Sequence, residues 1–193
     1  NPIRHVWQPK NGHGRTRAIN AAVRASHGTY LVLSDADCIP DPDFLEVHIK
    51  NRRLGYFLNG QRLLLPKNTR NLTPEQVAAN EHCKIDVEDS WKKNRNFHRK
   101  MTMYRALNPF AFNIFHERLR LMGANVSMWR EDFKAVNGFD ESYIGWGAED
   151  EDLRRRLDIL GVKWDDVVCK ALVRHYSHPP TPTKPRKVKY GNN

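Results

Sequence analysis

The feature that most constrains the fold is a short apolar run, residues 30–33 (Tyr-Leu-Val-Leu), which acidic residues follow almost at once. A continuous run of β-forming residues is typical of a strand that is buried on both faces of a parallel sheet. A helix is predicted before it, from about Arg15 to Ser26, because alanines recur there at helical spacing and Gly28 follows as a stop. Strands that alternate with helices predict an α/β chain with a mostly parallel central sheet.

Further elements are expected where similar patterns recur along the chain. The predicted strands are residues 3–7, 123–129 and 167–173. The predicted helices begin near residues 43 and 73 and cover residues 130–136 and 149–160. Residues 59–100 are otherwise expected to be mostly helix and loop, and the Pro- and Lys-rich residues 179–193 are expected to form an extended tail.

Composition narrows the classes of protein. Hydrophobic residues make up 39% of the 193, enough for one compact core, and no apolar run is long enough to predict a membrane span or a signal peptide. Three widely spaced cysteines suit neither a disulfide scaffold nor a CxxC metal site, so a reducing, cytoplasmic location is expected. The net charge of +10 implies an anionic partner: nucleic acid, a phosphate-bearing ligand or a lipid surface.

The first candidate site is the pair Asp35 and Asp37, directly after the predicted buried strand. In open α/β sheets, ligands bind outside the carboxyl ends of the strands. Two carboxylates there can converge on a hard cation that bridges phosphate oxygens. The alternative is an Asp-rich turn whose side chains bond their own backbone.

The second candidate is residues 146–152 (Trp-Gly-Ala-Glu-Asp-Glu-Asp), where four consecutive acids open a predicted helix. The helix dipole stabilises two or three acids at such a position, but four adjacent acids repel one another. A functional carboxylate is therefore expected among them. We expect the helix N-terminus to keep its pKa low, so that it is ionised and ready to accept a proton.

Two further candidates carry nitrogen donors. His175 and His178 follow the last predicted strand, and imidazoles added to carboxylates favour Mn²⁺ over Mg²⁺, although a lone histidine is more often structural. Arg15 and Arg17 follow a Gly-His-Gly loop at a predicted helix start, where they could receive a phosphate or a nucleotide. A solvated basic helix start explains these arginines equally well.

Together these motifs resemble the GT-A glycosyltransferases, above all the bacterial family 2 polysaccharide enzymes and the related animal β-1,4-galactosyltransferases. Residues 28–40 look like the family's strand that leads into its metal-binding Asp-x-Asp motif. Residues 123–127, 137–141 and 145–150, in that order, are similar to the acceptor-side signature. The resemblance runs from about residue 3 to residue 178 and is poor between residues 65 and 120. It implies one GT-A (Rossmann-like) catalytic domain over residues 1–178.

The resemblance also implies roles for individual residues. Asp37 and His175 would hold a divalent metal, Mn²⁺ or Mg²⁺, with Asp35 and His178 as alternatives, and Asp150 would be the catalytic base. The implied donor-binding residues are Arg15, Arg17, Asp35 and Ala36. The implied acceptor- and sugar-binding residues are Trp146, Gly147, Glu149 and Asn125. Ala148 stands where many relatives have a second glycine, a change that we expect the site to tolerate.

The function implied is metal-dependent, inverting transfer of a hexose or N-acetylhexosamine in polysaccharide biosynthesis. A UDP-sugar would be the donor, and a hydroxyl of a saccharide or lipid-linked saccharide would attack in a single displacement. The positive charge predicts peripheral contact with an anionic membrane, at its inner face, and no nucleic-acid partner is expected.

One departure from the family and three alternatives stay open. Residue 3 aligns with the family's third strand, so the first two βα units are expected to be absent, which predicts weak donor binding and an exposed sheet edge. The net charge and the basic stretches 92–105 and 184–189 would suit a nucleic-acid-binding module, although no known motif accompanies them. A sugar nucleotidylyltransferase would need a Gly-rich loop near the N-terminus. The third alternative is a catalytically inactive relative that binds carbohydrate.

Overall fold

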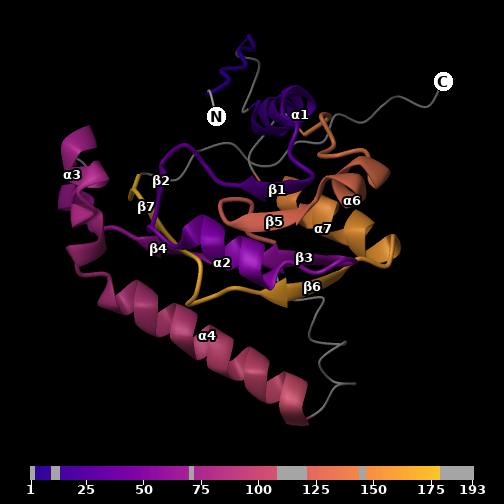
Figure 1. Ribbon diagram of the computed structural model, residues 1–193. Coiled ribbons are helices and arrows are strands. Elements are labelled where there is room, and N and C mark those ends of the chain that lie inside the picture. Colours follow the sequence, from indigo (N-terminus) through magenta and orange to yellow (C-terminus); the bar gives the residue numbers. More distant parts are fainter. Residues whose placement is uncertain (1–2, 10–13, 70–71, 108–120, 144–146, 179–193) are drawn as a thin grey trace.

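The computed structural model describes residues 3–9, 14–69, 72–107, 121–143 and 147–178, which form helices packed around two sheets (Figure 1). The helices are α1 (Arg15–Ala25), α2 (Phe44–Asn51), α3 (Pro74–Ala78), α4 (Glu88–Leu107), α6 (Arg130–Ala135) and α7 (Glu149–Ile159), with short 3₁₀ helices η1 (Lys67–Thr69) and η2 (Glu81–Lys84). The strands are β1 (Tyr30–Leu33), β2 (Cys38–Pro40), β3 (Tyr56–Asn59), β4 (Gln61–Leu64), β5 (Val126–Trp129), β6 (Lys163–Asp166) and β7 (Leu172–His175).

Both sheets mix parallel and antiparallel pairs. One has the strand order β1-β5-β3-β6 and the other the order β2-β7-β4. β5 is antiparallel to both of its neighbours, and only β3 with β6 and β4 with β7 are parallel among the described strands. The α/β prediction is confirmed, but the expectation of a mostly parallel sheet is wrong for these strands. A continuous apolar run indicates burial on both faces and does not determine strand direction.

Burial on both faces of β1 is confirmed, because alternate side chains enter two different cores. Leu31 belongs to the core that the sheet forms with α1, α6 and α7, whereas Val32 packs against the core beneath α2. β3 alternates in the same way, with Phe57 in the first core and Leu58 in the second. α2 lies across the sheet in Figure 1, on the side of the second core. The sheet is therefore the middle layer of three.

The N-terminal prediction is half right. α1 is confirmed, but residues 3–9 form no strand. Ile3 and Trp7 are 99% and 76% exposed, so their apolar side chains contribute nothing to a sheet. Instead, Arg4 donates a hydrogen bond of 2.7 Å to the carbonyl oxygen of Ala25, at the end of α1.

Four strands, β2, β3, β4 and β6, are not predicted by the sequence, and β7 begins later than the predicted strand at residue 167. Each of the four has only three or four residues, and β4 and β6 carry polar or charged side chains, so no long apolar run marks them. Gly60 joins β3 to β4, and a Cβ atom there would lie 2.3 Å from the Asn125 side chain. The missed strands thus depend on contacts with residues far along the chain.

The helix starts are predicted better, because their signals are local. Thr73 forms a capping box with Gln76: its hydroxyl accepts from the Gln76 amide, and the Gln76 side chain accepts from the Thr73 amide. α2, α6 and α7 also begin within one residue of their predicted starts. No described helix is both long and apolar enough to cross a bilayer. The division into a domain over residues 1–178 and a tail stays a prediction, and residues 179–193 lie outside the described residues.

A buried chain of hydrogen bonds joins the sheet to α2. The Tyr30 hydroxyl lies 2.8 Å from Ser127 Oγ, which lies 2.8 Å from His48 Nδ1. His48 Nε2 lies 3.0 Å from Asn125 Oδ1, and the Asn125 amide donates to two backbone carbonyl groups, one at the start of β4 and one just before β7. Since Asn125 Oδ1 only accepts, Nε2 carries the proton and Nδ1 accepts from Ser127. Burial, opposed by the bond to Asn125, lowers the pKa of His48 to about 4.

We predict that His48 makes the stability of the fold depend on pH. Between about pH 6.5 and 4 the unfolded chain binds a proton on His48 that the folded chain excludes. The free energy of unfolding therefore decreases as the pH is lowered, by up to about 1.4 kcal/mol per pH unit. Urea denaturation at several pH values across this range gives the slope of the unfolding free energy against pH. In His48→Gln this slope should be shallower, because about one proton fewer is taken up on unfolding. The exposed His5→Gln serves as control. An unchanged slope in His48→Gln would contradict the prediction.

Candidate active site

The pairing of β2 with β7 brings two distant parts of the chain together. Asp37 directly precedes β2, and His175 is the last residue of β7. Cys38 and His175 are register partners, and the Tyr176 amide donates a 3.1 Å hydrogen bond to the Asp37 carbonyl oxygen. The backbone ladder therefore places the Asp37 side chain beside the predicted metal-binding histidines.

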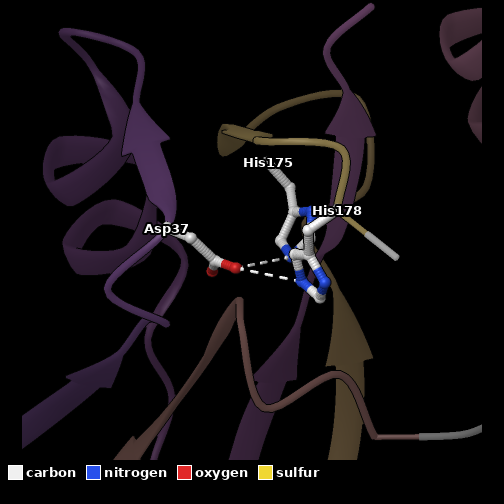
Figure 2. A group of neighbouring side chains, drawn as sticks. All are labelled: Asp37, His175 and His178. Atoms are coloured by element: carbon white, nitrogen blue, oxygen red, sulfur yellow. Dashed lines mark ion pairs between the residues drawn. The ribbon is translucent and has the colours of Figure 1, made fainter. Parts of the chain in front are cut away.

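These three side chains form a cluster that we call the metal cluster: Asp37, His175 and His178. Figure 2 shows both imidazole rings facing one carboxylate oxygen, with Asp37 Oδ2 3.2 Å from Nε2 of each histidine. The His175 side chain is buried, whereas those of Asp37 and His178 are 39% and 44% exposed. Burial and the charge of Arg62 lower the pKa of His175, although Asp37 opposes them, so its ring is neutral near pH 7.

The metal cluster fits a divalent cation. Its donor atoms all lie within 4.8 Å of one another. The 3.2 Å separations are close to the roughly 3.0 Å between adjacent ligands of an octahedral ion with bonds of about 2.1 Å. Two imidazoles beside one carboxylate favour a transition metal such as Mn²⁺ over Mg²⁺. The neighbouring Cys38 offers no thiolate, because burial and two nearby aspartates raise its pKa to about 12.

A second group of charges, which we call the arginine cluster, is built around Arg15 at the start of α1. Arg15 Nε donates to Asp35 Oδ1 over 2.9 Å, and Nη1 donates to Asp150 Oδ1 over 3.0 Å. Glu149 Oε1 lies 3.9 Å from Nη1. Only Ala36 separates Asp35 from Asp37, so a single turn links the arginine cluster to the metal cluster.

Asp150 is also held by the main chain. Its Oδ2 accepts a 3.1 Å hydrogen bond from the Gly123 amide. A Cβ atom at Gly123 would lie 2.2 Å from Arg15 Nη2 and 2.4 Å from Asp150 Oδ1, so any other residue would displace both groups. The sequence predicts neither this hydrogen bond nor the contact, since a lone glycine before a strand carries no signal of its own.

The pKa of Asp150 shifts in the direction opposite to the expectation. Burial raises its pKa, and Arg15 and the Gly123 amide offset only part of that effect. The expected lowering by the helix N-terminus is therefore wrong, because loss of solvent outweighs it. A raised pKa makes the carboxylate a stronger base. For Arg15, burial disfavours the charge but Asp150 and Asp35 outweigh it and raise the pKa, so the guanidinium stays charged.

The four consecutive acids at the start of α7 divide between two sets of partners. Glu149, buried, and Asp150 face Arg15. Farther along the same helix, Glu151 pairs with Arg154 at 2.6 Å and Asp152 with Arg156 at 2.7 Å. Repulsion among the acids is thus relieved by arginines on both sides, and only the first two acids contribute to the candidate site.

The remaining predicted site residues belong to neither cluster. Asn125 is fully buried in the hydrogen-bonded chain with His48, so the structure does not bring its side chain to the candidate site. Ala36 is exposed in the turn between the two aspartates. Arg17 is partly exposed and, two residues after Arg15, lies on another face of α1. Gly147 precedes α7 with φ of 100°, and Trp146 lies outside the described residues.

Sequence comparison identifies the family. Residues 1–115 of the 193 match glycosyl transferase family 2. The chain belongs to glycosyl transferase family 2. Residues 101–179 of this family 2 chain also match a second family, described as the N-terminal domain of galactosyltransferase. The predicted resemblance is confirmed, and the α/β architecture fits a GT-A-like fold.

Individual relatives resemble the family 2 chain over short segments. It is 42% identical over 50 residues to a β-N-acetyl-D-glucosaminide β-1,4-N-acetylglucosaminyl-transferase of Lymnaea stagnalis, covering 26% of the chain and 10% of the relative. It is 46% identical over 41 residues to human β-1,4-galactosyltransferase 4, covering 21% and 12%. It is 30% identical over 82 residues to β-1,4-galactosyltransferase 5 of Danio rerio, covering 40% and 21%. The matches thus span about a fifth of these relatives or less.

A mycobacterial protein of known crystal structure aligns with 93% of the family 2 chain and 47% of its own, with 20% identity and a TM-score of 0.43.

We predict that Ala148→Gly stabilises the family 2 chain. Ala148 has φ of 68°, a left-handed conformation that costs a residue with a side chain more than it costs glycine. Relief should raise the free energy of unfolding by about 0.5–1 kcal/mol. Chemical denaturation would measure it, with Ala22→Gly inside α1 as a matched control that should be destabilising by a similar amount. A loss of stability in Ala148→Gly would contradict the prediction.

Proposed function

We propose that this chain catalyses metal-dependent, inverting transfer of a hexose or N-acetylhexosamine from a UDP-sugar to a saccharide hydroxyl. The observation that carries the proposal is that the metal cluster and the base candidate, Asp150, are linked through Asp35 and Arg15. Membership of family 2 supports glycosyl transfer. The relatives named as galactosyl- and N-acetylglucosaminyltransferases support the two classes of sugar.

Asp37, His175 and His178 would hold Mn²⁺ or Mg²⁺. Such an ion supplies positive charge to the leaving diphosphate of a nucleotide-sugar. The half-exposed side chains of Asp37 and His178 leave an open side on which phosphate oxygens can approach. Asp35, held by Arg15, would stay beside the donor instead of joining the ligands.

Asp150 would accept the proton of the attacking hydroxyl. Its side chain is 30% exposed, and each carboxylate oxygen can accept more than the one hydrogen bond that it receives from Arg15 or Gly123. Those two bonds fix the carboxylate in place, and Arg15 favours its ionised form although burial raises the pKa. A positioned base with a raised pKa suits proton removal near neutral pH.

The alternatives from the sequence now have less support. A nucleic-acid-binding module or a sugar nucleotidylyltransferase would not be expected to match glycosyl transferase family 2 over residues 1–115. An inactive relative would not need to retain Asp37, His175 and Asp150 in these contacts. The sugar, the linkage, the acceptor and the location in the cell stay predictions.

We propose α4 as the surface for the expected contact with an anionic membrane. Residues 90–107 contain no acid, and the exposed cations among the described side chains of α4 are Lys92, Lys93, Arg95, Arg99 and Lys100. The opposite side of the helix is anchored: the Asn94 amide donates to the Arg62 carbonyl oxygen, and His98 Nδ1 lies 2.8 Å from Asp166. In Figure 1, α4 runs along one side of the molecule. Each cation near an anionic bilayer contributes about 1 kcal/mol.

We predict that substitutions of two acidic residues, Asp37 and Asp150, affect different steps. Asp37→Ala removes a metal ligand and should weaken Mn²⁺ binding at least tenfold, as measured by calorimetry. Asp150→Asn should leave Mn²⁺ binding unchanged and lower transfer from a panel of UDP-sugars by roughly 10²–10⁴-fold. Asp43→Asn, an exposed acid before α2, serves as control for both assays. Normal turnover in Asp150→Asn would require another base, and normal Mn²⁺ binding in Asp37→Ala would rule out the metal cluster.

We also predict that α4 controls binding to vesicles. Lys93→Glu, Arg99→Glu and Lys100→Glu together should weaken sedimentation with phosphatidylserine vesicles at least tenfold. The matched control reverses three exposed lysines elsewhere, Lys67, Lys163 and Lys170, with the same change in net charge. Equal losses in both variants would show that only net charge matters. Equal binding of the unaltered protein to neutral vesicles would rule out the electrostatic contact.

A further inference from the structure

A buried ion pair lies beside the metal cluster on the same two strands. Arg174 Nε is 2.9 Å from Asp41 Oδ1, and Nη2 is 3.3 Å from Asp41 Oδ2, so the two groups meet through two parallel hydrogen bonds. Their side chains are only 7% and 10% exposed. Nothing in the proposed reaction uses this pair directly.

Both members of the pair are close in sequence to a proposed metal ligand. Arg174 immediately precedes His175 in β7, and Asp41 follows β2, which itself begins after Asp37. The register pairs Cys38 with His175 and places Ile39 opposite Arg174. The ion pair therefore joins the two strands that carry the metal cluster.

The backbone ladder between these strands is short. β2 has three residues, and its last, Pro40, has no amide hydrogen to donate. The ladder ends with the Asp41 amide donating to the Leu172 carbonyl oxygen over 3.0 Å. A register slip of one residue would turn His175 to the other face of the sheet. The ion pair opposes such a slip, because Arg174 would lose its partner in a buried environment.

His175 also lacks the usual means of fixing its ring. A metal-binding histidine normally donates its second ring nitrogen to an acceptor. Nδ1 of His175 is buried and has no hydrogen-bond partner among the described residues. The orientation of the ring toward Asp37 therefore depends on how firmly the backbone of β7 is held.

Two further contacts hold the pair against the segment around η2. Arg174 donates to the carbonyl oxygens of Cys83 and Ile85, each over 3.3 Å. His82 Nε2 lies 3.2 Å from the Pro40 carbonyl oxygen. These contacts join three separate segments, which are β2, β7 and residues 82–85.

The same residues could be considered as a second metal site, because donor atoms of Asp41, His82 and Cys83 lie within 4.8 Å of one another. Both carboxylate oxygens of Asp41 are already bonded to the Arg174 guanidinium, whose charge repels a cation. Burial also raises the pKa of the Cys83 thiol, which disfavours the thiolate that would bind a metal. These donor atoms are therefore unsuited to a metal, because Asp41 is already paired with Arg174.

We propose that Arg174 and Asp41 are positioning residues that hold His175 and Asp37 at metal-binding distance. This inference rests on the proposed function, in which the metal cluster holds the ion. Neither residue touches the metal cluster through its own side chain in any described contact, and both act through the strands that carry the ligands.

The test compares Mn²⁺ affinity, by titration calorimetry, and the visible absorption of bound Co²⁺, which reports ligand geometry. Arg174→Met should weaken Mn²⁺ binding at least tenfold and alter the Co²⁺ spectrum, and Arg174→Lys should restore part of both. Because Arg174→Met leaves Asp41 buried and unpaired, the double variant Asp41→Asn with Arg174→Met is made as well. It removes both charges and should fold, with the same loss of affinity as the single variant.

Arg130→Met is the matched control. Arg130 holds the end of α1, with Nη1 2.7 Å from the Val23 carbonyl oxygen, and its loss should lower stability without changing Mn²⁺ affinity. Unchanged affinity and an unchanged Co²⁺ spectrum in a folded double variant would overturn the positioning role alone. Failure of the unaltered protein to bind Mn²⁺ would overturn the proposed function and this inference together. An equal loss in Arg130→Met would attribute the effect to general destabilisation and overturn the positioning role.

Discussion

The antiparallel pairing of β2 with β7 is the interaction on which the candidate site depends. It brings residues 37 and 175, which are far apart in the chain, to adjacent positions of one ladder. The side chains that meet there have opposite preferences for solvent: His175 is buried and Asp37 is partly exposed. The site therefore has one residue in the interior and another that solvent reaches, which leaves it accessible to a nucleotide-sugar donor.

Arg15 performs the corresponding task in the arginine cluster. It is the only cation for which a described contact joins Asp35, from the turn after β1, to Asp150, from the start of α7. The geometry needs Gly123, because no larger residue leaves room for Arg15 and Asp150 together. The backbone amide of Gly123 and the guanidinium of Arg15 thus hold the Asp150 carboxylate, with little freedom for its position.

Local patterns predicted the parts of the site that depend on local structure. Asp35 and Asp37 follow an apolar run, and the acids of α7 follow a left-handed turn, so both could be placed from neighbouring residues alone. Asn125 was expected at the sugar because of its place in a motif, but its amide satisfies buried groups from three segments. The direction of the strands and the raised pKa of Asp150 could not be predicted, because both depend on which distant segments cover a residue.

Because Arg15 bonds to both Asp35 and Asp150, a change in its position affects the proton affinity of Asp150. Asp150 receives two hydrogen bonds, from Arg15 Nη1 and from the Gly123 amide, and Arg15 is the only cation that bonds to it among the described residues. An anion that drew the guanidinium toward itself would leave Asp150 with the Gly123 amide alone, in surroundings that already disfavour negative charge. Its affinity for a proton would then increase. An anion bound at Arg15 would in this way make Asp150 a stronger base, without any movement of the main chain.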